Sequence, residues 1–114
     1  MTTVEMKEKV SGMFKEQCED YLIREMKSLS DLLEGGHISN SDLIKRMCFI
    51  DEIAAKTNRL AKGTEYEDTF SILSSMILDL YDEVKAGSIS FACIVSSLKE
   101  HILTVKRIID IYNI

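Results

Sequence analysis

The side chains that could do chemistry are scattered along this sequence of 114 residues. The three cysteines, Cys18, Cys48 and Cys93, lie far apart, without the close pairs typical of zinc sites or redox-active disulfides. Two interpretations stay open, namely buried thiols in a reducing compartment, or a functional thiol or disulfide. We expect three buried thiols, because isolated cysteines usually pack as small apolar side chains.

The two histidines, His37 and His101, also lack chemical partners in the sequence. Neither has a histidine or carboxylate three or four residues further on, as helical metal sites require. We expect each of them to be half-buried or on the surface. A calcium loop is disfavoured as well. Gly36-His37-Ile38-Ser39 resembles the core of an EF-hand loop, but Leu33 and Gly35 occupy positions that need oxygen ligands.

Neighbouring carboxylates are the last group of residues that could do chemistry. They include Glu19-Asp20, Asp51-Glu52 and Asp82-Glu83. Adjacent helical side chains point about 100° apart, so such neighbours do not form a catalytic pair. We expect solvated helix faces at all three places. The sequence therefore predicts no catalytic residue, no cofactor and no metal ion.

Composition and charge exclude several further classes of protein. The 14 basic and 19 acidic residues give a net charge of −5, whereas a nucleic-acid binder needs a basic stripe. The N-terminus lacks the basic and apolar regions of a signal peptide. No apolar run reaches the ~18 residues of a membrane span. We expect a single cytoplasmic domain spanning residues 1–114, with neither nucleic acid nor membrane as partner.

Two similar segments indicate how the elements are connected. Gly36-His37-Ile38-Ser39 and Gly87-Ser88-Ile89-Ser90 each combine a helix stop with a helix start. Glycine suits the left-handed position after a helix, and serine caps the next helix. The isoleucine before each cap can pack as a staple on Leu43 or Ile94. These corners predict two α-hairpins.

Apolar spacing then predicts four helices, over residues 2–34, 40–62, 64–86 and 90–114. The first is long, and Gly12 suggests either a break near Ser11-Gly12 or an overhanging first segment. In the second, Phe49 is expected to widen the buried seam. Thr64 and Glu67 are expected to form a capping box at the start of the third. The predicted seam of the fourth is Phe91, Val95, Leu98, Ile102, Val105, Ile109 and Tyr112.

Seams that repeat every 3.5 residues and short loops predict an all-α, antiparallel up-down-up-down four-helix bundle. The net charges of the four ranges are −3, +2, −5 and +1 in chain order. If the four helices are arranged in a square in chain order, each helix lies between two helices of opposite net charge. This arrangement disfavours wrong helix pairings.

The functional expectation is a non-enzymatic protein-binding module of the inhibitor, chaperone, immunity or regulatory-adaptor type, acting through helix faces. The expected partner is another protein with a basic surface. The alternative is a structural homo-oligomer, such as a homodimer, packing through the fourth helix or the N-terminal overhang. Candidate partner-binding residues are acidic side chains of the third range and apolar ones of the fourth: Glu65, Asp68, Asp79, Asp82, Leu103, Ile111 and Ile114.

Overall fold

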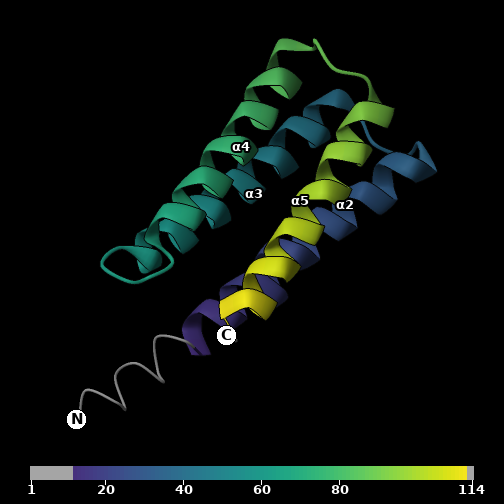
Figure 1. Ribbon diagram of the computed structural model, residues 1–114. Coiled ribbons are helices and arrows are strands. Elements are labelled where there is room, and N and C mark those ends of the chain that lie inside the picture. Colours follow the sequence, from purple (N-terminus) through teal and green to yellow (C-terminus); the bar gives the residue numbers. More distant parts are fainter. Residues whose placement is uncertain (1–11, 113–114) are drawn as a thin grey trace.

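The computed structural model, which describes residues 12–112, is a bundle of four antiparallel helices (Figure 1). The first helix runs from Gly12 through a π-helical segment, η1 (Gln17–Ile23), into α2 (Arg24–Gly35). It is followed by α3 (Asn40–Ala61), α4 (Glu67–Ala86) and α5 (Phe91–Tyr112). The predicted all-α, up-down-up-down bundle is confirmed.

The π-helical segment follows from the spacing of the apolar residues in the first helix. Four fully buried side chains are spaced four residues apart: Phe14, Cys18, Leu22 and Met26. In an α-helix each such step overshoots a full turn by about 40°, and three steps would turn the last side chain about 120° away from the first. The wider π turn reduces this drift and keeps all four in the core.

The predicted break near Ser11-Gly12 falls at the edge of the described residues. Gly12 is helical, and the departure from α-helical geometry begins five residues later, at Gln17. Ser11 and the overhang proposed for the start of the chain lie outside the described residues.

The second corner is built as the sequence predicts. Gly87 has a left-handed backbone with φ 68°, and its N–H donates to the Val84 carbonyl at 3.1 Å. The next N–H, of Ser88, donates to the Glu83 carbonyl at 3.2 Å, which completes a Schellman motif. The Ser88 hydroxyl donates to the same carbonyl. Ser90 caps α5 by accepting a hydrogen bond from the N–H of Cys93.

The first corner repeats the glycine stop and the serine cap. Gly36 also has φ 68°, and its N–H donates to the Leu33 carbonyl. The hydroxyl of Ser39 accepts from the N–H of Asp42 at 3.2 Å. Ile38 is half-buried and packs against the core that contains Leu43. Both corners therefore stop one helix and start the next within four residues.

The start of α4 differs from the predicted capping box. The helix begins three residues later than expected, at Glu67. The Thr64 hydroxyl accepts from the N–H of Tyr66 and donates to the Ala61 carbonyl, while the Glu67 carboxylate accepts from the N–H of Gly63. Since Gly63 has φ 78°, the chain makes a separate turn here, and both side chains serve that turn instead of capping each other.

The closest helix pairs are α3 with α4 and α2 with α5, as Figure 1 also shows. The helices joined by the glycine corners contact each other less, so the predicted α-hairpins are not the tightest units. Around the bundle the order is first helix, α3, α4, α5. Neighbours therefore alternate in charge as expected. An ion pair between Lys99 of α5 and Glu34 of α2 joins one such pair.

The core of residues 12–112 is mostly apolar, with three buried polar residues (Ser30, Thr57 and His101), and it is aromatic at one end. The Phe14 ring packs edge-on against Tyr66 at 5.4 Å and stacks on Phe70 at 5.5 Å, measured between centroids. These contacts tie the first helix to the start of α4. The seams that apolar spacing predicts for α3 and α4 are buried: Leu43, Met47, Ile50, Ala54, Thr57 and Ala61 in the first, and Tyr66, Phe70, Leu73, Ile77, Leu80 and Val84 in the second. The expectation for Phe49 is wrong, because this side chain is 47% exposed and does not widen the α3 seam.

The buried seam of α5 is also rotated from the predicted one. The buried residues are Ile94, Leu98, His101, Val105 and Ile108. Only Leu98 and Val105 belong to the predicted seam; Val95, Ile102 and Ile109 are half-buried and Phe91 is exposed. The helix carries two overlapping heptad seams, and the one that contains Ile94, His101 and Ile108 faces the core.

Candidate protein-binding surfaces

The polar residues that could do chemistry mostly serve the interface between α3 and α4. The Cys48 thiol donates to the Glu52 carboxylate at 3.8 Å. A hydrogen bond with the Cys48 side chain raises the pKa of Tyr81, and partial desolvation adds to this. The Lys85 ammonium lies 4.4 Å from the centroid of the Tyr81 ring and 3.5 Å from the Asp82 carboxylate. Of these contacts, only the one between Cys48 and Tyr81 joins the two helices, since the others lie within α3 or within α4.

Several expectations for these residues are wrong. Asp51 is half-buried and does not lie on a fully solvated face; burial raises its pKa, and the Asp82 and Glu52 charges add to the effect. Cys18 is buried as expected, which raises its pKa to about 12. Cys48 is half-buried and Cys93 is exposed, although both were expected in the core. The sequence does not predict the exposure of Cys48 and Cys93, because each of them has apolar neighbours in the chain.

The histidines divide in the same way. His37 is exposed, as expected, but His101 is 6% exposed and belongs to the buried seam of α5. Burial lowers its pKa, and the neighbouring Glu100 partly offsets this. Its Nδ1 atom and the Ser30 hydroxyl are buried without a hydrogen-bond partner among the described residues. Within residues 12–112, no cluster of three potential ligands is suited to hold a metal ion.

The predicted acidic residues lie at two places, the turn before α4 and the exposed side of that helix. Glu65 lies in the turn before α4, while Asp68, Asp79 and Asp82 lie on the helix, all exposed. Asp82 is turned toward α3 and pairs with Lys85. Asp68 and Asp79 point within about 20° of each other on α4, and Asp82 points about 40–60° away from them, because a helix advances about 100° per residue. Asp82 therefore borders the other two acids of the helix on the side nearer α3.

Asp68 and Asp79 bracket two exposed apolar side chains that the sequence analysis missed. Ile72 is 64% exposed and Met76 is 41% exposed, one turn apart on the same side of α4. Glu83 continues this surface, which we call the acidic–apolar face: Asp68, Ile72, Met76, Asp79 and Glu83. Its signal was present in the sequence as an apolar pair at four-residue spacing outside the buried seam.

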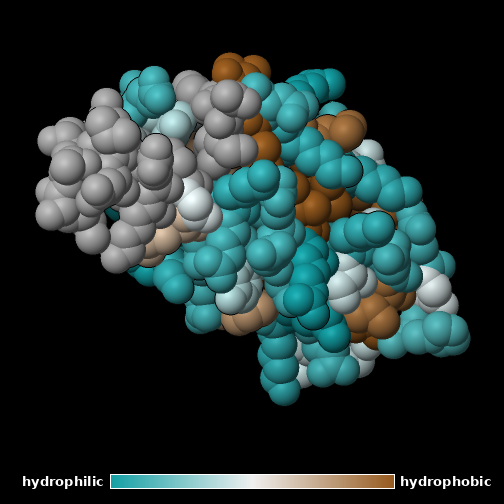
Figure 2. Space-filling view, turned by 90° about the horizontal axis from the view of Figure 1, so that it is seen from below, coloured by the Kyte–Doolittle hydropathy of each residue, from teal (hydrophilic) through white to brown (hydrophobic). Residues whose placement is uncertain are grey.

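The predicted apolar residues of α5 are exposed but separate. Leu103 is 51% exposed and Ile111 is 74% exposed. They lie about 12 Å apart along the helix and point in different directions. Ile114 lies outside the described residues. Figure 2 shows hydrophobic side chains open to the surface between hydrophilic ones when the bundle is seen from below.

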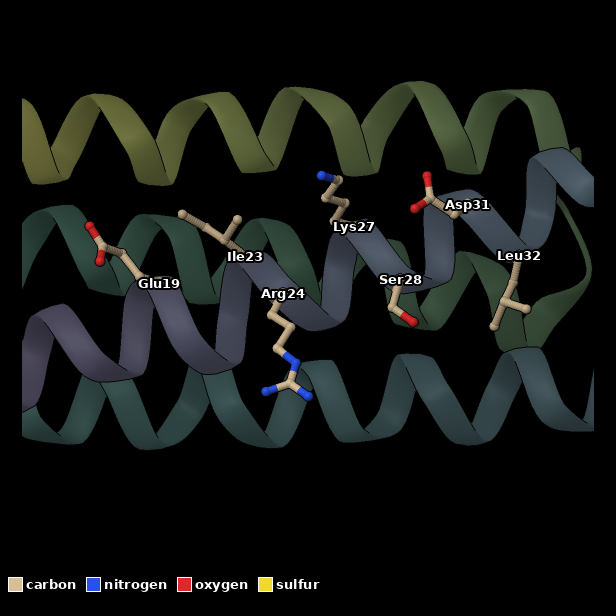
Figure 3. A pocket seen from close by; sticks show the side chains of 7 residues that line it. All are labelled: Glu19, Ile23, Arg24, Lys27, Ser28, Asp31 and Leu32. Atoms are coloured by element: carbon tan, nitrogen blue, oxygen red, sulfur yellow. The ribbon is translucent and has the colours of Figure 1, made fainter.

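A groove between the first helix and α3 carries the opposite charge. Figure 3 shows Arg24 and Ser28 on the side of the first helix that faces α3, with Lys27 and Asp31 on the side that faces α5. Arg46 of α3 reaches across and donates to the Ser28 hydroxyl at 3.5 Å. The exposed rings of Tyr21 and Phe49 lie in the same groove.

We call this surface the basic groove. Its lining residues are Gln17, Tyr21, Arg24, Glu25 and Ser28 of the first helix and Lys45, Arg46, Phe49, Glu52, Ile53, Lys56 and Arg59 of α3. Five of them are basic and two acidic, in a chain whose net charge is −5. Phe49 is the residue that links its two halves, because it lines both.

Comparisons of the chain with protein-family models, with curated proteins and with solved structures found no match. None of the helices among residues 12–112 is long and apolar enough to cross a membrane. The two charged surfaces of this chain are therefore the features that bear on its function.

Proposed function

We propose that this chain is a non-enzymatic protein-binding module that acts through the acidic–apolar face of α4. The observation that carries the proposal is the exposure of Ile72 and Met76 side by side between Asp68 and Asp79. Single exposed apolar side chains are common on protein surfaces. Two of them one turn apart, with charges at both ends, form a strip that an amphipathic partner covers.

The charges on this face specify the partner. Carboxylates at both ends of the strip steer a basic surface toward α4 and penalise an acidic one. The partner is therefore a protein with basic side chains around an apolar groove. Inhibitors, chaperones, immunity proteins and regulatory adaptors all act by such binding without turning over a substrate. Three unpaired thiols, one of them exposed, favour the reducing cytoplasm.

A homo-oligomer is the second candidate. In the version expected from the sequence, α5 packs across a symmetry axis through Leu103 and Ile111, both exposed. Their separation on α5 makes this version weaker than binding through α4. Mapping the residues that lie in the contact distinguishes binding through α4 from packing through α5.

The experiment compares capture of the partner from the source cell by three purified chains. Ile72→Ser combined with Met76→Ser removes the apolar strip, and Leu78→Ser is the matched control. Leu78 is 46% exposed on the same helix but lies off the acidic–apolar face. We expect the double variant to lose a protein that the wild-type chain and Leu78→Ser both retain.

Two outcomes would contradict the proposal. Capture that survives the double variant, or that Leu78→Ser abolishes equally, would move the binding surface away from Ile72 and Met76. The steering argument has its own test, because association with the captured protein should slow as ionic strength rises. A rate that does not change with salt would remove the role given to Asp68 and Asp79.

A further inference from the structure

The basic groove is the complement of the acidic–apolar face in both charge and spacing. On α4, eleven residues separate Asp68 from Asp79, about 16 Å along the helix. On α3, Lys45 and Lys56 are also eleven residues apart, with Phe49 between them. An acid–apolar–acid strip on α4 thus matches a base–aromatic–base groove in length and in the order of its charges.

The apolar centres match as well. Ile72 and Met76 offer two aliphatic side chains one turn apart. The groove offers the rings of Tyr21 from η1 and Phe49 from α3, which are 43% and 47% exposed. Burying flexible aliphatic side chains against two rings removes apolar surface on both sides from water. The bases at the groove ends then meet the carboxylates of α4.

We infer that the occupant of the basic groove is α4 of a second copy of this chain. The inference rests on the proposed function and names the partner of the acidic–apolar face. The chain itself supplies a helix with the required charge, spacing and exposed apolar pair. The net charge of −5 makes two copies of the chain repel each other overall. The basic groove is then a local site that attracts the acidic side chains of another copy.

The positions of the two surfaces determine the form of the assembly. The groove lies between the first helix and α3. Tyr81 is the α4 residue turned toward α3, and Met76 lies about 140° around the helix from it. The acidic–apolar face therefore points toward the α5 side, opposite the groove. Contacts of this kind are heterologous, so copies add head to tail rather than closing as a two-fold dimer.

The test is sedimentation of the wild-type chain over a concentration series from micromolar to millimolar, at low and at high salt. We expect an average mass that rises with concentration past twice the monomer value of 13.0 kDa. High salt should lower the average mass, because charge pairs help to hold the contact. Phe49→Asp should block the groove, and Ile72→Asp with Met76→Asp should block the face. Each variant alone should remain a monomer.

Mixing the two variants supplies the control for folding. The groove-blocked chain keeps an intact face, and the face-blocked chain keeps an intact groove. An equimolar mixture should form a 1:1 complex of twice the monomer mass and nothing larger. The new acids repel each other at the second contact. Recovery of the complex requires that both variants are folded.

Three results would overturn the inference: a wild-type chain that stays monomeric throughout, one that stops at a closed dimer, or a mixture that does not associate. The proposed function can hold even if this inference fails. If the wild type is monomeric but a captured protein is still lost with the Ile72 and Met76 variants, the binding face stands and only the second copy is refuted.

Discussion

Replacing Gly87 with alanine isolates the backbone energy of the corner between α4 and α5. A Cβ atom built on Gly87 would meet nothing within 4 Å, so Gly87→Ala creates no clash. Its cost comes from holding a residue with a Cβ at φ 68°, which is on the order of 1–2 kcal/mol. Alanine also lowers the conformational entropy of the unfolded chain, which offsets part of this cost. The net loss in the free energy of unfolding is about 1 kcal/mol.

Gly12 offers a matched control with the opposite sign. It is helical, and a Cβ there would also meet nothing within 4 Å. Gly12→Ala should therefore stabilise the fold by about 0.5–1 kcal/mol. Urea titration followed by circular dichroism measures both, and at a typical slope each 1 kcal/mol shifts the midpoint by roughly 0.5–1 M. The reasoning is refuted if Gly87→Ala is neutral or Gly12→Ala destabilises the protein.

Three further predictions concern a cap, a buried base and the thiols. Ser90→Ala should cost about 1 kcal/mol in the same urea titration, because it removes the hydroxyl that caps α5. His101 has a folded-state pKa below 6.5, so stability should fall as pH drops below 6.5, where the unfolded chain binds the proton more readily. His101→Gln should reduce that loss and His37→Gln should not, as pH-dependent unfolding will show. A thiol reagent at neutral pH should label exposed Cys93 first and reach buried Cys18 only in urea.

Features encoded by short-range signals could be predicted from the sequence. Both glycine corners and the serine caps follow from residues within one turn of the position they control. The seams of α3 and α4 follow from one apolar row at helical spacing. The four-helix order follows from short loops and alternating charge. Each of these rests on local geometry that tertiary packing did not override.

Features that depend on the neighbouring helix could not be predicted. The sequence of α5 contains two heptad seams, and only packing decides that His101 faces inward and Phe91 outward. The sequence likewise does not show that Phe49 lies beside Tyr21, since the two residues belong to different helices. The π segment is an intermediate case. Its repeated four-residue spacing is visible in the sequence. The spacing predicts a π segment only if all four side chains are known to lie in one core, which the sequence does not show.

Hydroxyl-radical footprinting of the complex with the captured partner tests the central claim most directly. The two candidate surfaces have comparable probes: Ile72 and Met76 on α4 are 64% and 41% exposed, and Leu103 and Ile111 on α5 are 51% and 74% exposed. Binding through the acidic–apolar face predicts that the α4 pair is protected from oxidation while the α5 pair reacts as in the free chain. Protection of Leu103 and Ile111 with unchanged oxidation of Ile72 and Met76 would contradict it.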